Sequence, residues 1–196
     1  QVKPLNDTLY HRKEDIIKAK NFDEFFEIYK DELHKHLTRD MEVGNMLHAY
    51  ASKDECILGS LFVTGCIEKG LSMHKGGASG FSEMGGGAGL MCTIDSLAII
   101  KQFVFDEKIV SAEEMLNALE NNWDGYEHLH SMILNKGKFF GNDYELSDEV
   151  AKRVTTAINE FAKDKTDIFG KHYIGVVAPG YREYHKVFGA VTGATP

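Results

Sequence analysis

The chemistry that this chain could carry out centres first on a thiol and a nearby carboxylate. Cys66 precedes Glu68 in the stretch TGCIEKG, and such a pair could act as a nucleophile or radical carrier with a group for proton transfer. Cys66 also falls in the apolar rhythm of a helix expected between Leu58 and Leu71, where a small buried thiol is common. We therefore favour an inert cysteine here.

A glycine-rich stretch at residues 76–89, GGASGFSEMGGGAG, holds further candidates. Each glycine costs conformational entropy on folding, so such a stretch is either a linker or a tightly shaped segment. Phe81 and Met84 among the glycines favour a shaped, buried loop and strand, which either lines a ligand site or serves packing alone. Glu83 is the one carboxylate of this stretch. If it is desolvated, its pKa would be raised and it could act on a substrate; if it lies in a surface turn, it would have no such role.

Aromatic residues follow the segment KHYIGVVAPG at residues 171–180, which reads as a buried strand. Tyr181, Tyr184 and His185 could project into a cleft at the end of this strand, although ordinary packing is the favoured interpretation. The predicted substrate contacts are Glu83, Met84, Tyr181 and Tyr184.

Signatures of nucleotide and metal sites are missing from the sequence. No lysine follows the glycines at 85–89 as a phosphate-binding loop requires, and their spacing does not match the dinucleotide fingerprint. The pairs His34/His36 and His128/His130 stand two residues apart on expected helices and so point to different faces. We expect no bound metal.

The composition is that of an ordinary globular protein, with 43% hydrophobic and 27% charged residues among 196. The formal net charge of −8 argues against a nucleic-acid or membrane partner, since both would need clustered Lys and Arg. Three cysteines without CxxC spacing, and no secretion signal or membrane-spanning run, favour the cytoplasm. Because the chain begins at Gln1 and stops on turn-forming residues at Pro196, we expect a fragment of a longer protein.

Helix dominates the expected secondary structure. Asn21 and Glu24 stand in capping-box spacing before an amphipathic helix that we extend to Ala51, and Ser111 with Glu114 opens another. Further helices are expected from Asp54 toward Leu71, from Asp95 or Ser96 through Val104, over Tyr126–Leu134 and along residues 141–163. One or two strands cannot make a sheet alone, so partner strands should lie outside this span.

Four segments then occur in a recognisable order. They are CIEKGLSMHKGGA (66–78), DSLAIIKQFVFDEKIVSAEEMLNALENNWDGYE (95–127), KFFGND (138–143) and VFGAVTGATP (187–196). Together they resemble consecutive segments of glycyl radical enzymes, the superfamily of pyruvate formate-lyase, glycerol and diol dehydratases, choline lyase and arylacetate decarboxylases. The resemblance covers residues 54–196, whereas residues 1–53 agree in helical character only.

The resemblance implies an α/β fold. Residues 1–196 would form one partial domain, a mostly helical segment with few strands, of a ten-stranded α/β barrel. In such enzymes a glycyl radical near the C-terminus, installed by an iron–sulfur activase that uses S-adenosylmethionine, oxidises a cysteine on a barrel loop, and the thiyl radical abstracts hydrogen from the substrate.

The radical groups themselves are expected outside this span. The radical glycine of the family lies downstream of the matched segments. The Gly-Cys-x-Glu loop lies upstream, because Gly76-Gly77-Ala78 after Cys66 fits a later helix. We therefore expect no catalytic residue among residues 1–196. Many relatives carry an aromatic residue and Asn after Gly-Gly-Ala, where this chain has Gly80 and Phe81, so the resemblance does not fix the substrate.

The functional hypothesis follows from the resemblance. The chain would be a segment of a cytoplasmic, anaerobic glycyl radical lyase or acyltransferase that cleaves a C–C, C–O or C–N bond of a small substrate, like a formate acetyltransferase, dehydratase or decarboxylase. The parent enzyme would be a homodimer or higher oligomer served by its activating enzyme, and this span alone would be inactive. The rival hypothesis is a helical interaction or scaffold module derived from such an enzyme.

Overall fold

The computed structural model describes residues 2–80, 82–84 and 89–175, with the backbone alone at Val2, Glu83 and Met84. These residues fall into two units. Unit 1 takes residues 2–34 and 89–157, and unit 2 takes residues 35–80, 82–84 and 158–175.

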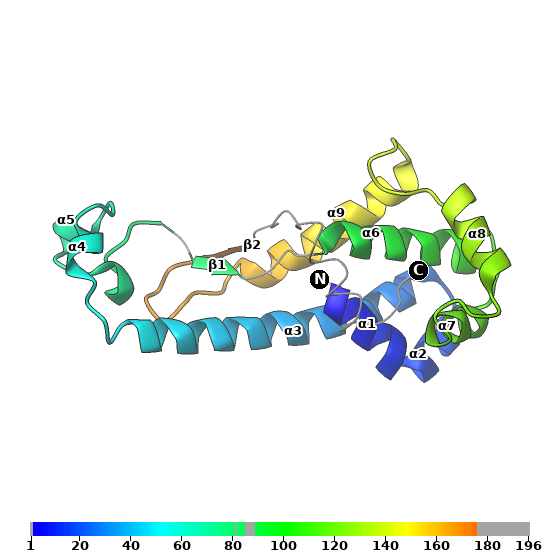
Figure 1. Cartoon of the computed structure of the whole chain (residues 1–196), viewed down its shortest axis with the longest axis horizontal. Coiled ribbons are helices and arrows are strands. Elements are labelled where there is room, and N and C mark those ends of the chain that lie inside the picture. Colours follow the sequence, from blue (N-terminus) through cyan, green and yellow to red (C-terminus); the bar gives the residue numbers. More distant parts are fainter. Residues whose placement is uncertain (1, 81, 85–88, 176–196) are drawn as a thin grey trace. The chain divides into compact units, whose positions relative to one another are not determined.

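Unit 1 consists of helices (Figure 1). In chain order these are α1 (Val2–His11), α2 (Lys13–Lys18), the first part of α3 (Phe22–Ala51), α6 (Leu90–Ile99), the π-helical η2 (Ile100–Asp106), α7 (Ala112–Glu120), α8 (Glu127–Lys136) and most of α9 (Glu145–Ala162). The expected helices over 126–134 and 141–163 correspond to α8 and α9.

The core of unit 1 is built from apolar residues at helical spacing. One face of α3 buries Phe22, Phe25, Phe26, Tyr29 and Leu33. Most of α6 and part of η2 are buried, and the largest fully buried side chains of unit 1 lie on these and the neighbouring helices. They include Leu5, Leu9, Ile94, Leu97, Phe103, Met115 and Leu119.

Both predicted capping sites are present. The backbone N–H of Glu24 donates to Asn21 Oδ1 at 2.9 Å, and the N–H of Glu114 donates to Ser111 Oγ at 3.1 Å. Each bond satisfies one of the amide donors that the first turn of a helix leaves unpaired. The predicted starts of α3 and α7 are therefore confirmed.

Two predicted helices are wrong in their bounds. α6 begins at Leu90, after Gly89 in the left-handed conformation, so Asp95 and Ser96 lie inside the helix and cap nothing. The single helix expected from Asp54 toward Leu71 is instead two single turns, α4 (Ile57–Ser60) and α5 (Cys66–Lys69). Gly65 separates them with φ of +93°, and a Cβ there would fall 2.1 Å from Ser79 Oγ.

Unit 2 contains the two strands of the described residues. It comprises the second part of α3, α4, α5, η1 (Met73–Lys75), β1 (Ser82–Met84), the end of α9 and β2 (Tyr173–Gly175). β1 and β2 pair in parallel, with Ser82 opposite Tyr173 and Glu83 opposite Ile174 (Figure 1). The strand expected near residues 171–180 is thus present at 173–175, and the glycine-rich stretch supplies its partner.

None of the helices in the described part of the chain has an apolar stretch that could span a membrane.

Candidate functional site

One buried carboxylate, Asp167, bonds to both sides of the β1–β2 pair. Its side chain is 2% exposed, and Ser82 Oγ donates to its Oδ2. The backbone N–H groups of Phe169 and Lys171 donate to Oδ1 at 2.9 and 2.8 Å. Asp167 therefore joins the first residue of β1 to the turn that leads into β2.

Hydrogen-bond donors keep the buried carboxylate of Asp167 ionised. Burial by itself raises the pKa of Asp167, but the hydrogen bonds from Ser82, Lys171 and Phe169 and the nearby His48 outweigh it, so the pKa lies below the ordinary aspartate value. Asp167 is therefore suited to a structural role and not to proton transfer. An ionised carboxylate whose oxygens already accept hydrogen bonds is a poor proton acceptor.

α3 adds a second set of contacts to the same turn. Asn45 Oδ1 accepts from Tyr173 Oη at 2.9 Å and from the backbone N–H of Ile168 at 3.1 Å. His48 Nδ1 lies 3.8 Å from Asp167 Oδ2. Burial, with a smaller effect of the Asp167 charge, raises the pKa of Tyr173, so its hydroxyl stays a donor. Asn45 thus joins α3 to β2 and to the turn before it, and His48 lies beside the buried carboxylate of that turn.

The four predicted substrate contacts divide between the described and undescribed residues. Glu83 and Met84 lie on β1, where their backbones pair with Ile174 and Gly175. Their side chains are outside the description, as are Tyr181 and Tyr184 altogether. Their roles as substrate contacts stay predictions. What the structure adds is that Glu83 sits one residue from Ser82, whose side chain anchors the strand.

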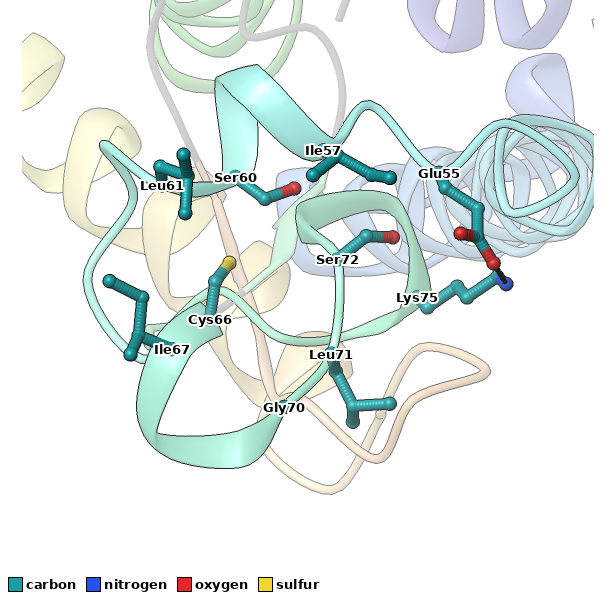
Figure 2. A pocket seen from close by; sticks show the side chains of 10 residues that line it. All are labelled: Glu55, Ile57, Ser60, Leu61, Cys66, Ile67, Gly70, Leu71, Ser72 and Lys75. Atoms are coloured by element: carbon teal, nitrogen blue, oxygen red, sulfur yellow. Dashed lines mark hydrogen bonds and ion pairs between the residues drawn. The ribbon is translucent and has the colours of Figure 1, made fainter.

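Cys66 lies in a separate place, at the wall of a pocket (Figure 2). The pocket has a volume of about 320 Å³, and Cys66 is 3% exposed at the start of α5. Among the described residues, no hydrogen bond to its Sγ is present, and Glu68 is exposed on the same short helix. On the pocket wall Glu55 and Lys75 form an ion pair at 2.5 Å, and the Lys75 hydrogen bond lowers the pKa of Glu55.

In the part of the chain that the structure describes, no group of three or more His, Cys, Asp or Glu side chains is placed to hold a metal ion. Trp123 and His130 instead stack with ring centroids 4.7 Å apart. His34 Nε2 lies 3.4 Å from the carbonyl oxygen of Ala157.

A further anchor, which sequence reasoning missed, holds the loop after α8 in unit 1. Asp95 Oδ1 accepts from the N–H of Phe140 at 2.7 Å, and Gln102 Oε1 accepts from the N–H of Lys138 at 3.0 Å. Gln102 Nε2 donates to the carbonyl of Lys136 at 3.2 Å. Burial raises the pKa of Asp95 and the Phe140 hydrogen bond opposes that rise. Two of the four ordered segments, 95–127 and 138–143, are thus linked by direct hydrogen bonds.

Comparisons with known proteins agree along nearly the whole chain. The family model for pyruvate formate lyase-like proteins matches residues 6–180. Trans-4-hydroxy-L-proline dehydratase of Clostridioides difficile is 31% identical over 177 residues, which are 90% of this chain and 22% of that enzyme. (2S)-3-sulfopropanediol dehydratase of Klebsiella oxytoca is 39% identical over 94 residues, 47% of this chain and 11% of that protein.

Solved structures give the same result for the fold. The crystal structure of hydroxyproline dehydratase from Clostridioides difficile with trans-4-hydroxy-L-proline bound matches with a TM-score of 0.89 and 27% identity, over 100% of this chain and 26% of that chain. A solved structure on 1,2-propanediol dehydration in Roseburia inulinivorans matches with a TM-score of 0.84 and 27% identity, over 98% of this chain and 26% of that chain.

These matches place the chain inside much longer relatives, since it spans 22% of the length of hydroxyproline dehydratase. The family resemblance is therefore confirmed: the family model covers the first three ordered segments, and the fourth, at 187–196, lies beyond that match and outside the described residues. The chain belongs to the pyruvate formate lyase-like family of glycyl radical enzymes.

Proposed function

We propose that the chain is part of a longer glycyl radical lyase, here called the parent enzyme, that removes water from a small hydroxylated substrate by cleaving a C–O bond. The observation that carries the proposal is the likeness of the whole chain to hydroxyproline dehydratase, with a TM-score of 0.89. Other relatives are also described as dehydratases, and further ones as isethionate sulfite-lyases, so a lyase is favoured over an acyltransferase.

The radical groups are proposed to lie in the parent enzyme outside these residues. Among the described cysteines, only Cys66 has the Gly-Cys-x-Glu spacing, and it does not fit the role: its thiol is buried beside apolar side chains and no base contacts it. A thiyl radical supplied from elsewhere in the parent enzyme would open an unactivated C–H bond, which acid–base catalysis alone does not do. The activase that uses S-adenosylmethionine is proposed as the partner.

The contribution of this chain is proposed to be a shaped wall for the substrate. β1 and β2 would be two neighbouring strands of the barrel, because a parallel pair normally lies inside a larger sheet. The Ser82–Asp167 hydrogen bond supports this proposal, because it links the residue before Glu83 to the turn that leads into β2. We propose that Glu83 and Met84, with Tyr181 and Tyr184, contact the substrate.

The test uses the parent enzyme, purified without oxygen and treated with its activase and S-adenosylmethionine. We expect an organic radical signal by electron paramagnetic resonance, followed by loss of water from one of three probes: trans-4-hydroxy-L-proline, propane-1,2-diol or glycerol. A preparation without activase should give neither. A radical without turnover of any hydroxylated probe contradicts the dehydratase proposal, and no radical under any condition favours the scaffold module.

The proposed site is tested in the same preparation by Glu83→Gln, with Asp164→Asn, an exposed carboxylate in unit 2, as the matched control. Glu83→Gln should keep the radical signal and lower kcat/KM by about a factor of 10 to 100, the scale of one lost hydrogen bond between the substrate and a charged group. Asp164→Asn should change neither. Equal kcat/KM in the two variants removes Glu83 from the site.

A further inference from the structure

The second half of α3 exposes an apolar stripe, defined as Val43, Met46, Leu47 and Tyr50. The spacing of i, i+3, i+4 and i+7 puts these four side chains on one helical face. Their exposed fractions run from 47% for Val43 to 72% for Met46 and Tyr50. Such a face normally packs against another element, because exposing it leaves apolar area in water.

The pocket beside Cys66 is bordered by a second set of exposed apolar side chains (Figure 2). We call Ile57, Leu61, Ile67 and Leu71 the apolar rim; each lines the pocket and each is at least 45% exposed. Phe62, next to Leu61 in the chain, is 90% exposed. The pocket volume of about 320 Å³ is enough to receive a large apolar side chain.

Apolar exposure of the described residues is concentrated in this part of unit 2. Ten of the seventeen exposed large apolar residues lie between positions 43 and 71. The described residues of unit 2 bury five hydrophobic residues: Leu37, Cys66, Ile158, Ala162 and Tyr173. A unit that exposes more large apolar side chains than it buries lacks the burial that stabilises an independent fold.

We infer that the apolar stripe and the apolar rim are covered by apolar helical segments of the same parent enzyme, one lying along the stripe and one inserting a large side chain into the rim pocket. This inference rests on the proposed function only in assuming a longer polypeptide. The occupant is argued from length: the curated relatives extend far beyond the matched 22%, so a parent enzyme of similar length has residues available to cover this part. A second copy of the chain is the competing occupant.

The experiment compares methionine oxidation by dilute peroxide in the parent enzyme and in the 196-residue chain. Met46 is 72% exposed in this chain and Met115 is 2% exposed in the core of unit 1. We expect Met46 to be oxidised readily in the chain at low concentration and several-fold more slowly in the native parent enzyme. Met115 should be slow in both and become reactive only on unfolding. Readily oxidised Met46 in the native parent enzyme overturns the inference.

A pair of variants separates the two occupants. Leu47→Glu places a charge on the stripe, and Ala49→Glu places the same charge on an exposed position about a third of a turn from the centre of the stripe. In the parent enzyme we expect Leu47→Glu to lower the melting temperature relative to Ala49→Glu, and Leu47→Ala, which keeps the helix, to lower it less.

Equal melting temperatures for Leu47→Glu and Ala49→Glu in the parent enzyme contradict the inference. A second outcome also contradicts the inference. If Leu47→Glu leaves the melting temperature of the parent enzyme unchanged but sedimentation shows that the enzyme dissociates into lighter species, a second copy covers the stripe. None of these readouts depends on a radical, so a parent enzyme without activity can still protect Met46.

Discussion

Asp167 shows how a single buried side chain can set the position of a strand. Its two oxygens accept from Ser82 on β1 and from two backbone amides of the turn before β2. Because each donor would be left unsatisfied in a dry site if the carboxylate were removed, the arrangement is worth more than one hydrogen bond.

We predict that Asp167→Asn weakens the fold at neutral pH and flattens its acid dependence. The folded-state pKa of Asp167 lies below its unfolded value, so its contribution is complete above about pH 4 and is lost as pH falls through the lowered value. Urea unfolding of the parent enzyme at pH 7 should show a loss of about 1 to 3 kcal/mol. Between pH 5 and pH 2 the wild type should lose stability more steeply than the variant.

The exposed carboxylate of Asp164 provides the control for that series. Asp164→Asn should follow the wild-type curve at every pH, since surface charges contribute little to stability. Parallel curves for Asp167→Asn and the wild type would show that the carboxylate is not held below its ordinary pKa.

Among the elements, α3 is the longest, at 30 residues from Phe22 to Ala51, and it contains one glycine in its interior. Gly44 has open space around the position of a Cβ, with nothing within 4 Å. No close contact in the folded chain therefore requires a glycine at this position, although glycine loses more backbone entropy on folding than other residues.

We predict that Gly44→Ala stabilises the parent enzyme by about 0.5 to 1 kcal/mol, because alanine loses less backbone entropy in a helix. Gly77→Ala is the matched opposite case, since a Cβ there would lie 2.1 Å from the carbonyl oxygen of Leu71. Thermal or urea unfolding should move the two variants in opposite directions. A stabilised Gly77→Ala, or a weakened Gly44→Ala, would contradict this account of the two glycines.

Elements specified by neighbouring residues could be predicted from the sequence. Asn21 and Ser111 mark the starts of α3 and α7 because a cap is made within three residues. Asp95 looks like such a cap but bonds to Phe140, 45 positions away, so no local pattern could assign it. The break at Gly65 depends on a close approach to Ser79 that apolar periodicity does not reveal.

The candidate site was predicted only in part, for the same physical reason. Glu83 and Met84 stood out as a carboxylate and an apolar side chain among glycines, and the strand there is real. Asn45 and Asp167 did not stand out, because each acts through partners more than 80 positions distant or through backbone amides. A lone polar residue on a helix or in a turn carries no signal of such contacts.

At the scale of the whole molecule, net charge governs how copies of the chain meet. The formal charge is −8 at pH 7 and the isoelectric point is near 5.6. Repulsion between copies therefore fades as pH falls toward 5.6, while the apolar stripe stays exposed.

We predict that the 196-residue chain is least soluble near its isoelectric point. Light scattering at fixed concentration should rise as pH falls from 8 to 5.6, and moderate salt at pH 8 should raise it by screening the charges. Leu47→Glu should reduce the rise more than Ala49→Glu. Scattering that does not change between pH 8 and pH 5.6 would show that charge repulsion does not keep the copies apart.

Unit 2 is interrupted in the sequence by unit 1, and this has a consequence for synthesis. The Ser82–Asp167 bond joins residues 85 positions apart, with most of unit 1 encoded between them. At about 5 to 20 residues per second, a ribosome completes β1 roughly 4 to 17 s before it delivers Asp167. For that interval β1 has no β2 to accept its hydrogen bonds, so the nascent chain carries an unpaired strand edge beside a glycine-rich segment while the helices of unit 1 emerge.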